Sequence, residues 1–177
     1  MGIIRKILPV KLICAFLFKD EKNADKIQKV MENQYGPIDF KSNSFPFAFS
    51  DYYKPEMGPL LFKQFVSFAN LLDPCQLSLI KVITNDIEDA EAQQQKRLIN
   101  IDPGYLELSK LVLASTKNFS HRVYIGNGIY GDIQLVWRHG KFQENPWTYP
   151  DYKQPLAHNF FTQVRNDLHK KILEIKE

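Results

Sequence analysis

The longest apolar run of the chain is Val10–Phe18, a near-continuous stretch with the length of a β-strand. A run of this kind predicts a central strand that is covered on both faces of its sheet. After it the spacing of apolar residues changes to three and four, which predicts a helix from Asp20 or Asn23 through Gln34. Gly36-Pro37 follows directly and is typical of a helix end.

The next segments alternate between strand and helix signals. Asp73-Pro74-Cys75-Gln76 combines a cap, a proline and a glutamine in the order that starts a helix. Asp51–Pro59 has the composition of a loop. Four segments are expected as strands: Ile38–Ser44, the proline-interrupted edge Phe45–Phe49, the alternating Phe62–Ala69, and Leu98–Ile101. The order strand, helix, strand, strand, helix, strand is that of a ferredoxin-like split β-α-β fold.

The last third of the chain predicts a hairpin and a helix. His121–Ile125 and Ile129–Arg138 flank a glycine turn, and apolar residues from Leu156 to Ile172 recur at every fourth position. Tyr105–Thr116 is ambiguous between strand and helix, and we interpret it as a helix. The sequence therefore predicts a single α+β domain over residues 1–177 (core about 10–175), with a mixed or antiparallel sheet, a C-terminal hairpin and an amphipathic C-terminal helix.

The amino-acid composition limits the classes of partner that we expect the protein to bind. The 177 residues are 44% hydrophobic and 24% charged, as in soluble globular proteins, and the net charge is +3. This mild, dispersed charge permits a small anionic ligand, but it lacks the dense basic stripe of a nucleic-acid interface, so no nucleic-acid partner is expected. The oligomeric state is not predictable from these values.

The amino terminus briefly resembles a secretion signal. Pro9 and Lys11 interrupt its apolar stretch, and no small-residue cleavage site follows. The stretch is also too short to span a bilayer, so no membrane association is expected. Cys14 and Cys75 both lie in apolar contexts without metal-ligand spacing. We therefore expect a cytoplasmic protein.

Several motifs in order resemble one bacterial family, domain of unknown function 4416. The resemblance covers about Val10–Val164 and rests on the following segments: Phe45-Pro-Phe-Ala-Phe, Asp51-Tyr-Tyr, Glu56-Met-Gly-Pro, Phe65-Val-Ser-Phe, Asn100-Ile-Asp-Pro-Gly-Tyr, Ser109-Lys-Leu-Val-Leu-Ala, Ser120-His-Arg-Val-Tyr and Pro146-Trp-Thr-Tyr-Pro-Asp-Tyr. The family has no established activity. Some members are loosely labelled nucleotide-binding, and the resemblance implies no more than this.

The glycine motifs do not identify a nucleotide fold. No Walker A pattern occurs, which excludes a P-loop GTPase. Gly126-Asn-Gly-Ile-Tyr-Gly131 spells G-x-G-x-x-G, but a strand pattern follows it instead of the helix that holds a pyrophosphate. We interpret it as a tight hairpin turn.

Basic residues on either side of Ser115-Thr116 form the candidate anion site. If the segment between them is helical, Lys110 and Lys117 lie two turns apart on one face, and with His121 and Arg122 they would clamp phosphate or carboxylate oxygens. His121 is also the candidate acid–base catalyst. The alternative is a solvated helix face beside a hairpin edge, with a structural histidine.

Asp102, Asp51 and Tyr52 complete the predicted ligand-binding residues. Asp102 precedes Pro103-Gly104, which we interpret as a turn that exposes the carboxylate to a metal or a ribose hydroxyl; the alternative is a turn that uses the carboxylate itself. Tyr52 and other loop tyrosines would either stack against a flat ligand or pack over the sheet. No histidine or cysteine spacing predicts a metal site, and the cofactor is unknown.

Three functions remain open at this stage. The first is a binding protein for a small anionic, nucleotide-like or phosphorylated ligand. The second is a magnesium-assisted phosphoryl-transfer or hydrolytic enzyme with Asp102 and Asp51 on the metal, and the third is a non-catalytic interaction module. The first two require Asp102, His121 and Arg122 to meet at one surface, which we expect if their strands are antiparallel neighbours.

Overall fold

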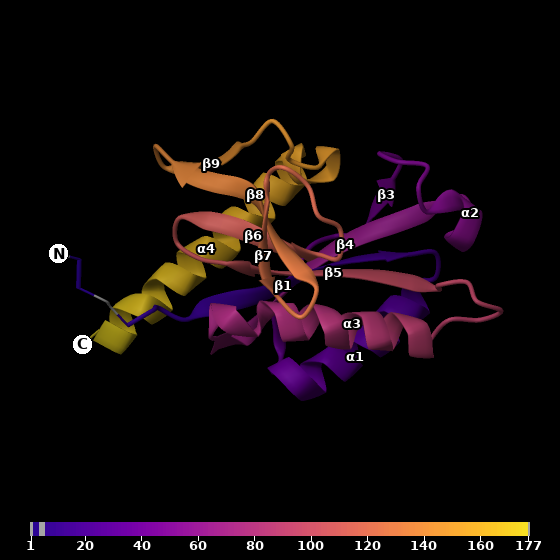
Figure 1. Cartoon of the computed structure of the whole chain (residues 1–177), viewed down its shortest axis with the longest axis horizontal. Helices are drawn as coiled ribbons and strands as arrows, with labels where there is room; N and C mark the ends of the chain where they lie inside the picture. Colours follow the sequence, from indigo (N-terminus) through magenta and orange to yellow (C-terminus); the bar gives the residue numbers. More distant parts are fainter. Residues whose placement is uncertain (1, 4–5, 177) are drawn as a thin grey trace.

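The computed structural model describes residues 2–3 and 6–176, and this part of the chain forms one antiparallel sheet with helices on both faces (Figure 1). The strands are β1 (Val10–Phe18), β2 (Ile38–Lys41), β3 (Phe45–Phe47), β4 (Leu61–Leu72), β5 (Ile99–Leu106), β6 (Lys110–Ser115), β7 (Arg122–Gly126), β8 (Ile129–Arg138) and β9 (Lys141–Glu144). The helices are α1 (Glu21–Tyr35), α2 (Lys54–Met57), α3 (Leu77–Ala90) and α4 (Pro155–Lys176), with short 3₁₀ turns at Pro74–Gln76 and Pro150–Lys153.

The strand order of the sheet is β2-β4-β1-β5-β6-β8-β7, with β3 added beside β4 and β9 beside β8. Every strand pair is antiparallel. The apolar strand β1 lies between β4 and β5, and all nine of its residues are buried. This confirms the central strand that its composition predicts.

Alternate residues of β1 face two different helical layers. Leu12, Cys14 and Phe16 pack in one core cluster with residues of α1 and α3, whereas Ile13 and Ala15 pack in a second cluster with residues of α4. Figure 1 shows α1 and α3 together below the sheet and α4 crossing its other face. The domain is therefore an α+β sandwich of three layers, and its larger core lies under the predicted C-terminal helix.

Several local predictions are confirmed. Asp20 caps α1 by accepting a hydrogen bond from the Lys22 amide (3.0 Å), as its position before the helical pattern indicates. The glycine turn joins β7 and β8, and Gly126, Asn127 and Gly128 all have positive φ angles (101°, 52° and 74°). A left-handed backbone at consecutive positions explains why two glycines occur there.

The prediction for Tyr105–Thr116 is wrong, because this segment is not helical. Strand β5 continues without a turn through Asp102-Pro103-Gly104, and β6 returns beside it from Lys110. A Cβ atom on Gly104 would lie only 2.4 Å from the Val112 carbonyl oxygen, so this glycine permits close strand contact instead of a turn. Pairing with β1 over the whole of β5 overrides the local turn preference of proline and glycine.

Strands β5 and β6 separate immediately beyond this close contact. Their pairing covers only Gly104–Leu106 of β5, so the preceding half of β5 is paired with β1 alone. The backbone N–H and C=O of Ile101 in that half are bonded instead by side chains of α3. The separation opens a gap in the sheet in front of α3.

We predicted that the strand containing Asp102 (β5) and the strand that begins near His121 (β7) are antiparallel neighbours. The two strands are antiparallel, but they are not neighbours. The successive antiparallel pairs make β5 and β7 antiparallel to each other, but β6 and β8 lie between them. Within the described residues, no helix is long and apolar enough to cross a membrane. The sheet and helices together exceed a four-stranded ferredoxin-like unit, so the fold as a whole is best described as α+β with an antiparallel sheet.

Candidate functional site

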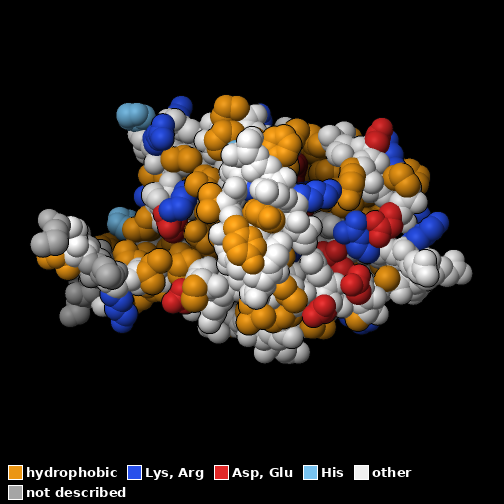
Figure 2. All heavy atoms as spheres, viewed as in Figure 1, with side chains coloured by type: hydrophobic (Ala, Val, Ile, Leu, Met, Phe, Trp, Pro, Cys, Tyr) orange, Lys and Arg blue, Asp and Glu red, His pale blue; other side chains and the backbone are white. Residues whose placement is uncertain are grey.

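The gap between β5 and β6 is part of a cleft of about 860 Å³. Its walls come from β4, β5, β6 and β8, from α3 and the segment between α3 and β5, from the segment that runs from β3 to α2, and from the 3₁₀ turn before α4. Figure 2 shows a hollow on this face, right of centre, with acidic and basic side chains around it. A cleft of this volume is in the range that accommodates a small organic ligand.

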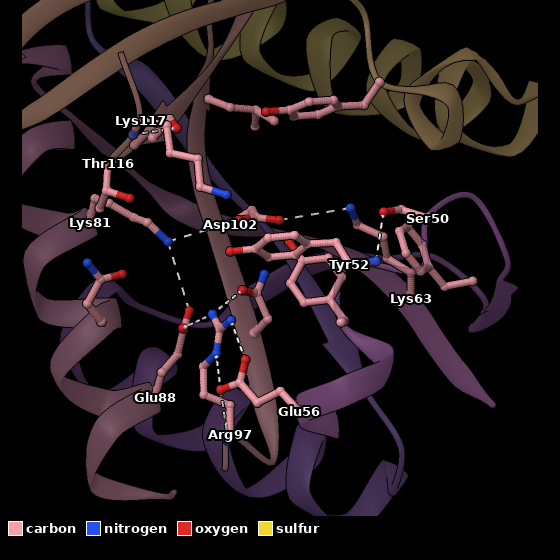
Figure 3. Close-up of a pocket in the computed structure, with 18 of the residues that line it drawn as sticks. Ser50, Tyr52, Glu56, Lys63, Lys81, Glu88, Arg97, Asp102, Thr116 and Lys117 are labelled. Atoms are coloured by element: carbon pink, nitrogen blue, oxygen red, sulfur yellow. Dashed lines mark hydrogen bonds and ion pairs between the residues drawn. The ribbon is translucent and has the colours of Figure 1, made fainter. Parts of the chain in front are cut away.

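Asp102 lies at the centre of the cleft between two lysines. Lys63 of β4 and Lys81 of α3 each place Nζ 4.0 Å from one of its carboxylate oxygens, and they approach from opposite sides (Figure 3). Within the described part of the chain, no group donates a hydrogen bond to the Asp102 carboxylate at normal distance, although both lysines are buried. The charge of Asp102 is therefore balanced while its hydrogen-bonding capacity stays open.

Each of the two lysines is held by a shorter contact elsewhere. Lys63 Nζ lies 2.6 Å from Oδ2 of the buried Asp151. Lys81 Nζ donates to the Ile101 carbonyl oxygen at 2.8 Å, and Glu88 accepts from the Ile101 amide at 2.7 Å. Side chains of α3 thus replace the strand partner that β5 loses where β6 diverges, which satisfies buried backbone groups that would otherwise be costly.

Arg97 forms the side of the cleft below Asp102 in Figure 3 and joins three polar side chains. It binds Glu56 through Nε (2.8 Å) and Nη2 (2.7 Å), and its Nη1 donates to Glu88 (3.1 Å) and to Asn100 Oδ1 (2.8 Å). The hydrogen bond from Arg97 is the main cause that lowers the pKa of Glu56. Burial, in contrast, raises the pKa of Glu88 despite its two cationic neighbours.

Aromatic rings line the opposite side and the mouth of the cleft. They belong to Phe47, Phe49, Tyr52, Tyr53 and Tyr149. Tyr52 and Tyr53 meet edge to face with ring centroids 5.0 Å apart, and Lys117 Nζ lies 4.1 Å from the Tyr52 ring centroid. Burial raises the pKa of Tyr149 to about 12, so its hydroxyl is protonated at neutral pH. The mouth therefore combines exposed π surface with a lysine.

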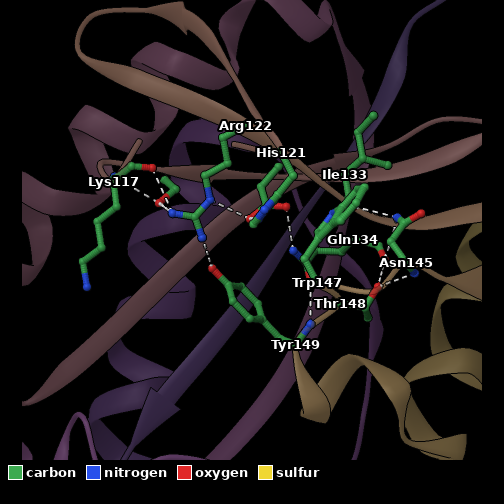
Figure 4. Close-up of polar contacts among 11 residues, drawn as sticks. Lys117, His121, Arg122, Ile133, Gln134, Asn145, Trp147, Thr148 and Tyr149 are labelled. Carbon is green, nitrogen blue, oxygen red and sulfur yellow. Dashed lines mark hydrogen bonds and ion pairs between the residues drawn. The ribbon is translucent and has the colours of Figure 1, made fainter. Parts of the chain in front are cut away.

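A second polar cluster centres on Asp132 of β8, which lines the cleft beside β6, and its other members Arg122, His121 and Gln134 lie outside the lining. Figure 4 shows these three side chains together. Asp132 is 1% exposed and accepts hydrogen bonds from Arg122 Nε and Gln134 Nε2, both at 2.8 Å. His121 Nε2 lies 3.5 Å from the same carboxylate, and its ring stacks on Trp147 at a centroid distance of 4.9 Å. We name Asp132, His121, Arg122 and Gln134 the Asp132 network.

The Asp132 network also fixes the aromatic loop that follows β9. Register slips by one residue near Gln134 where β8 pairs with β6, and loop side chains bind the carbonyls at this irregularity. Trp147 Nε1 and Asn145 Nδ2 both donate to the Ile133 carbonyl at 2.9 Å. Arg122 Nη2 then donates to the Tyr149 hydroxyl at 2.6 Å. These contacts hold Tyr149 against the cleft.

The residues predicted as a site are therefore divided among different places. Asp102 and Tyr52 line the cleft. His121 and Arg122 belong to the Asp132 network, where Arg122 uses its donors on Asp132, Ser115, the Lys117 carbonyl and Tyr149. Lys110 pairs with Glu107 at the far end of β6 from the cleft, and the exposed Asp51 pairs with Lys54 (2.6 Å) outside the cleft lining.

Sequence reasoning missed the lysines at the centre of the cleft. Lys63 interrupts an alternating apolar strand, and Lys81 occupies a position on the buried side of α3. The available signal was a charged residue at a position where the periodicity predicts a buried apolar one. Charged side chains are rarely buried without a partner, so a lysine at such a position indicates a buried polar site. Arg97 and Asn100 carry no comparable signal, since Arg97 lies at the end of a loop and Asn100 at the start of β5.

The cleft offers little support for a metal site. No group of three or more metal-ligating side chains occurs among the residues that the structure describes. Asp51, the expected second ligand of a magnesium ion, does not line the cleft with Asp102. Two lysines beside Asp102 already supply the positive charge that a metal would bring.

Comparison with known proteins identifies a family but no activity. No curated protein and no solved structure matches the chain significantly. One family model matches, described as domain of unknown function (DUF4416), over residues 8–168. This match includes β1, the cleft, the Asp132 network and most of α4. The chain belongs to the DUF4416 family.

Proposed function

We propose that the protein binds a small anionic, nucleotide-like ligand in the cleft between β5 and β6. The observation that carries the proposal is the group of three lysines (63, 81 and 117) around an Asp102 carboxylate that keeps its hydrogen-bonding capacity, next to aromatic rings. In Figure 3 the Lys117 side chain extends toward Asp102 from above. Convergent charged groups beside apolar surface are typical of ligand sites.

The pairing of charges in the cleft favours an anion near Lys81 and Lys117. Four carboxylates have close cationic partners: Glu56 and Glu88 with Arg97, Asp132 with Arg122, and Asp151 with Lys63. Lys81 lies 3.9–4.0 Å from its carboxylate neighbours, and Lys117 lies over an aromatic ring. Phosphate or carboxylate oxygens would complete the donor capacity of both ammonium groups.

The tyrosines favour a flat group next to that anion. Tyr52 is 59% exposed in the absence of a ligand, and Tyr53 meets it edge to face. A nucleobase or another planar ring would cover this π surface, which contributes on the order of 1 kcal/mol beyond the area buried. Asp102 would accept a hydrogen bond from a hydroxyl between the two ends. Asp102 and Tyr52 are thus the predicted site residues that we retain.

A thermal-shift screen with nucleotides, sugar phosphates and inorganic phosphate tests the proposal. A ligand at a hundred times its dissociation constant adds about 2.7 kcal/mol to the free energy of unfolding. The Kd of a compound that stabilises the protein should rise about tenfold in Lys117→Met. Lys54→Met, a control that removes a lysine outside the cleft lining, should leave Kd unchanged. Equal affinities of both variants, or no stabilising compound, would contradict the proposal.

We also propose that Val10–Leu106 is a ferredoxin-like unit to which the rest of the sheet is added. The order β2-β4-β1-β5 with antiparallel pairs, and the placement of α1 and α3 in one core cluster, support this assignment. The cleft would then form where the added strands diverge from the last strand of the unit. A crystal structure compared with known ferredoxin-like domains tests this assignment.

A further inference from the structure

Asn100 presents a buried hydrogen-bond donor to the cleft without a partner. The residue is 4% exposed and lines the cleft, and its Nδ2 has no hydrogen-bond partner in the described part of the chain. Its Oδ1 accepts from Arg97 Nη1 at 2.8 Å. Arginine can only donate, so this contact fixes which end of the amide is oxygen. An unpaired buried amide donor is rare and costly, which points to a missing acceptor.

Asp102 presents the complementary acceptor two residues further along β5. Asn100 and Asp102 lie opposite Leu17 and Ala15 of β1, and residues two apart on a strand project from the same face. The rise of an antiparallel strand places their backbones about 7 Å apart. One face of β5 thus offers a donor at Asn100 and a carboxylate acceptor at Asp102.

We propose that this pair binds the sugar of a ribose phosphate unit, as found in a ribonucleotide. A carboxylate accepts hydrogen bonds from two neighbouring hydroxyls, and the Asn100 amide donates to a hydroxyl or ring oxygen of the same sugar. Carboxylates hold ribose hydroxyls in this way in dinucleotide-binding proteins. The phosphate then lies at Lys81 and Lys117. This inference rests on the proposed function and specifies its substrate class.

A deoxyribose ligand would lose one of these hydrogen bonds. Removing the 2-hydroxyl leaves the Asp102 carboxylate, whose side chain is 27% exposed, with one hydrogen bond fewer. A hydrogen bond to a charged group of this kind changes affinity by about tenfold to a hundredfold. The sugar, and not the phosphate, is therefore the source of the expected discrimination.

Isothermal titration of the wild-type protein tests the inference without any substitution. The probes are ribose 5-phosphate, 2-deoxyribose 5-phosphate, the matched ribonucleoside and 2′-deoxyribonucleoside monophosphates, and inorganic phosphate. We expect each ribose compound to bind at least about tenfold more tightly than its deoxy partner. Equal affinities within a pair would overturn the sugar site but leave the anion site, whereas no binding by any probe would overturn both.

Two substitutions test the assigned roles. Asp102→Asn removes the acceptor charge, and the ratio of ribose to deoxyribose affinity should fall toward one. Asn100→Asp keeps the acceptor for Arg97 but replaces the donor to the ligand, so ribose compounds should bind about tenfold more weakly or not at all. A ratio that stays at the wild-type value in a folded Asp102→Asn protein would overturn the assignment. Circular dichroism of each variant establishes that it is folded.

Discussion

The Asp132 network and the cleft around Asp102 contain similar residues but differ in how completely these residues are paired. Asp132 is almost fully buried, and its partners Arg122, Gln134 and His121 all come from within the chain. Asp102 has two lysines at 4.0 Å, and the neighbouring Asn100 amide donor has no partner among the residues that the structure describes. A network whose hydrogen-bonding groups are all paired stabilises the fold, whereas a network with unpaired donors and acceptors can still bind a ligand.

This difference explains why the charged residues beside the glycine turn were wrongly predicted to form an anion site. His121 and Arg122 have the chemistry of an anion site, but β7 turns them onto Asp132 and the aromatic loop. Arg122 therefore acts on the cleft indirectly, because its donors hold four residues that line it: Ser115, Lys117, Asp132 and Tyr149. Residue type alone does not distinguish a binding group from a group that is already bound.

The largest expected effect is on stability. Asp132→Ala should lower the free energy of unfolding by about 3–5 kcal/mol, because it leaves the Arg122 guanidinium, only 10% exposed, without its buried carboxylate. Asp102→Ala should change it by less than about 1 kcal/mol, since Lys63 and Lys81 keep their closer contacts. Chemical denaturation of both variants measures this difference. Equal losses would remove the distinction between the two regions.

A second prediction uses the two glutamates that share Arg97. The lowered pKa of Glu56 means that its charged form stabilises the folded state above the ordinary pKa near 4.5, and that this contribution is lost as pH falls through the lowered value. The raised pKa of Glu88 has the opposite sign: its contribution declines as pH rises from 4.5 to the raised value.

Unfolding measured from about pH 3 to about pH 8 should therefore separate the two glutamine variants, because the pKa shifts of the two glutamates have opposite directions. The loss of stability in Glu56→Gln should be greatest at neutral pH and should shrink in acid. Relative to wild type, Glu88→Gln should gain stability as pH rises above about 4.5. Parallel pH profiles for the two variants would show that the carboxylates are not in the opposed environments described above.

The smallest expected effect concerns His121. Its ring stacks on Trp147 and lies 3.5 Å from Asp132, so His121→Gln should cost about 1 kcal/mol of stability. The affinity for a ribose phosphate should stay within about twofold of wild type, because His121 does not line the cleft. A loss of binding as large as that of Lys117→Met would restore His121 as a ligand-binding residue.

Sequence periodicity was sufficient for elements with a clear apolar pattern, either a continuous apolar run or one apolar face. Strand β1, helix α1 and helix α4 follow from the spacing of their apolar residues, and the β7–β8 hairpin follows from its glycines. Pro103-Gly104 was misinterpreted because its strand conformation depends on pairing with β1, which is distant in sequence. Local propensity carries no information about that partner.

The centre of the cleft was only partly predictable for the same reason. Asp102 and Tyr52 could be selected as polar or aromatic residues near apparent turns. Lys63, Lys81 and Asn100 come from β4, α3 and β5, and only the folded sheet brings them together. The orientation of the Asn100 amide depends in addition on Arg97. No spacing along the chain encodes these contacts.

The most direct test of the account is the response of side-chain N–H groups to ribose 5-phosphate in nuclear magnetic resonance spectra. The Asn100 side-chain amide should shift and gain protection from exchange on saturation, because its Nδ2 acquires an acceptor. The Gln134 amide and the Trp147 indole, which already donate to Asp132 and Ile133, should change little. Shifts at Gln134 and Trp147 with an unchanged Asn100 would contradict the account.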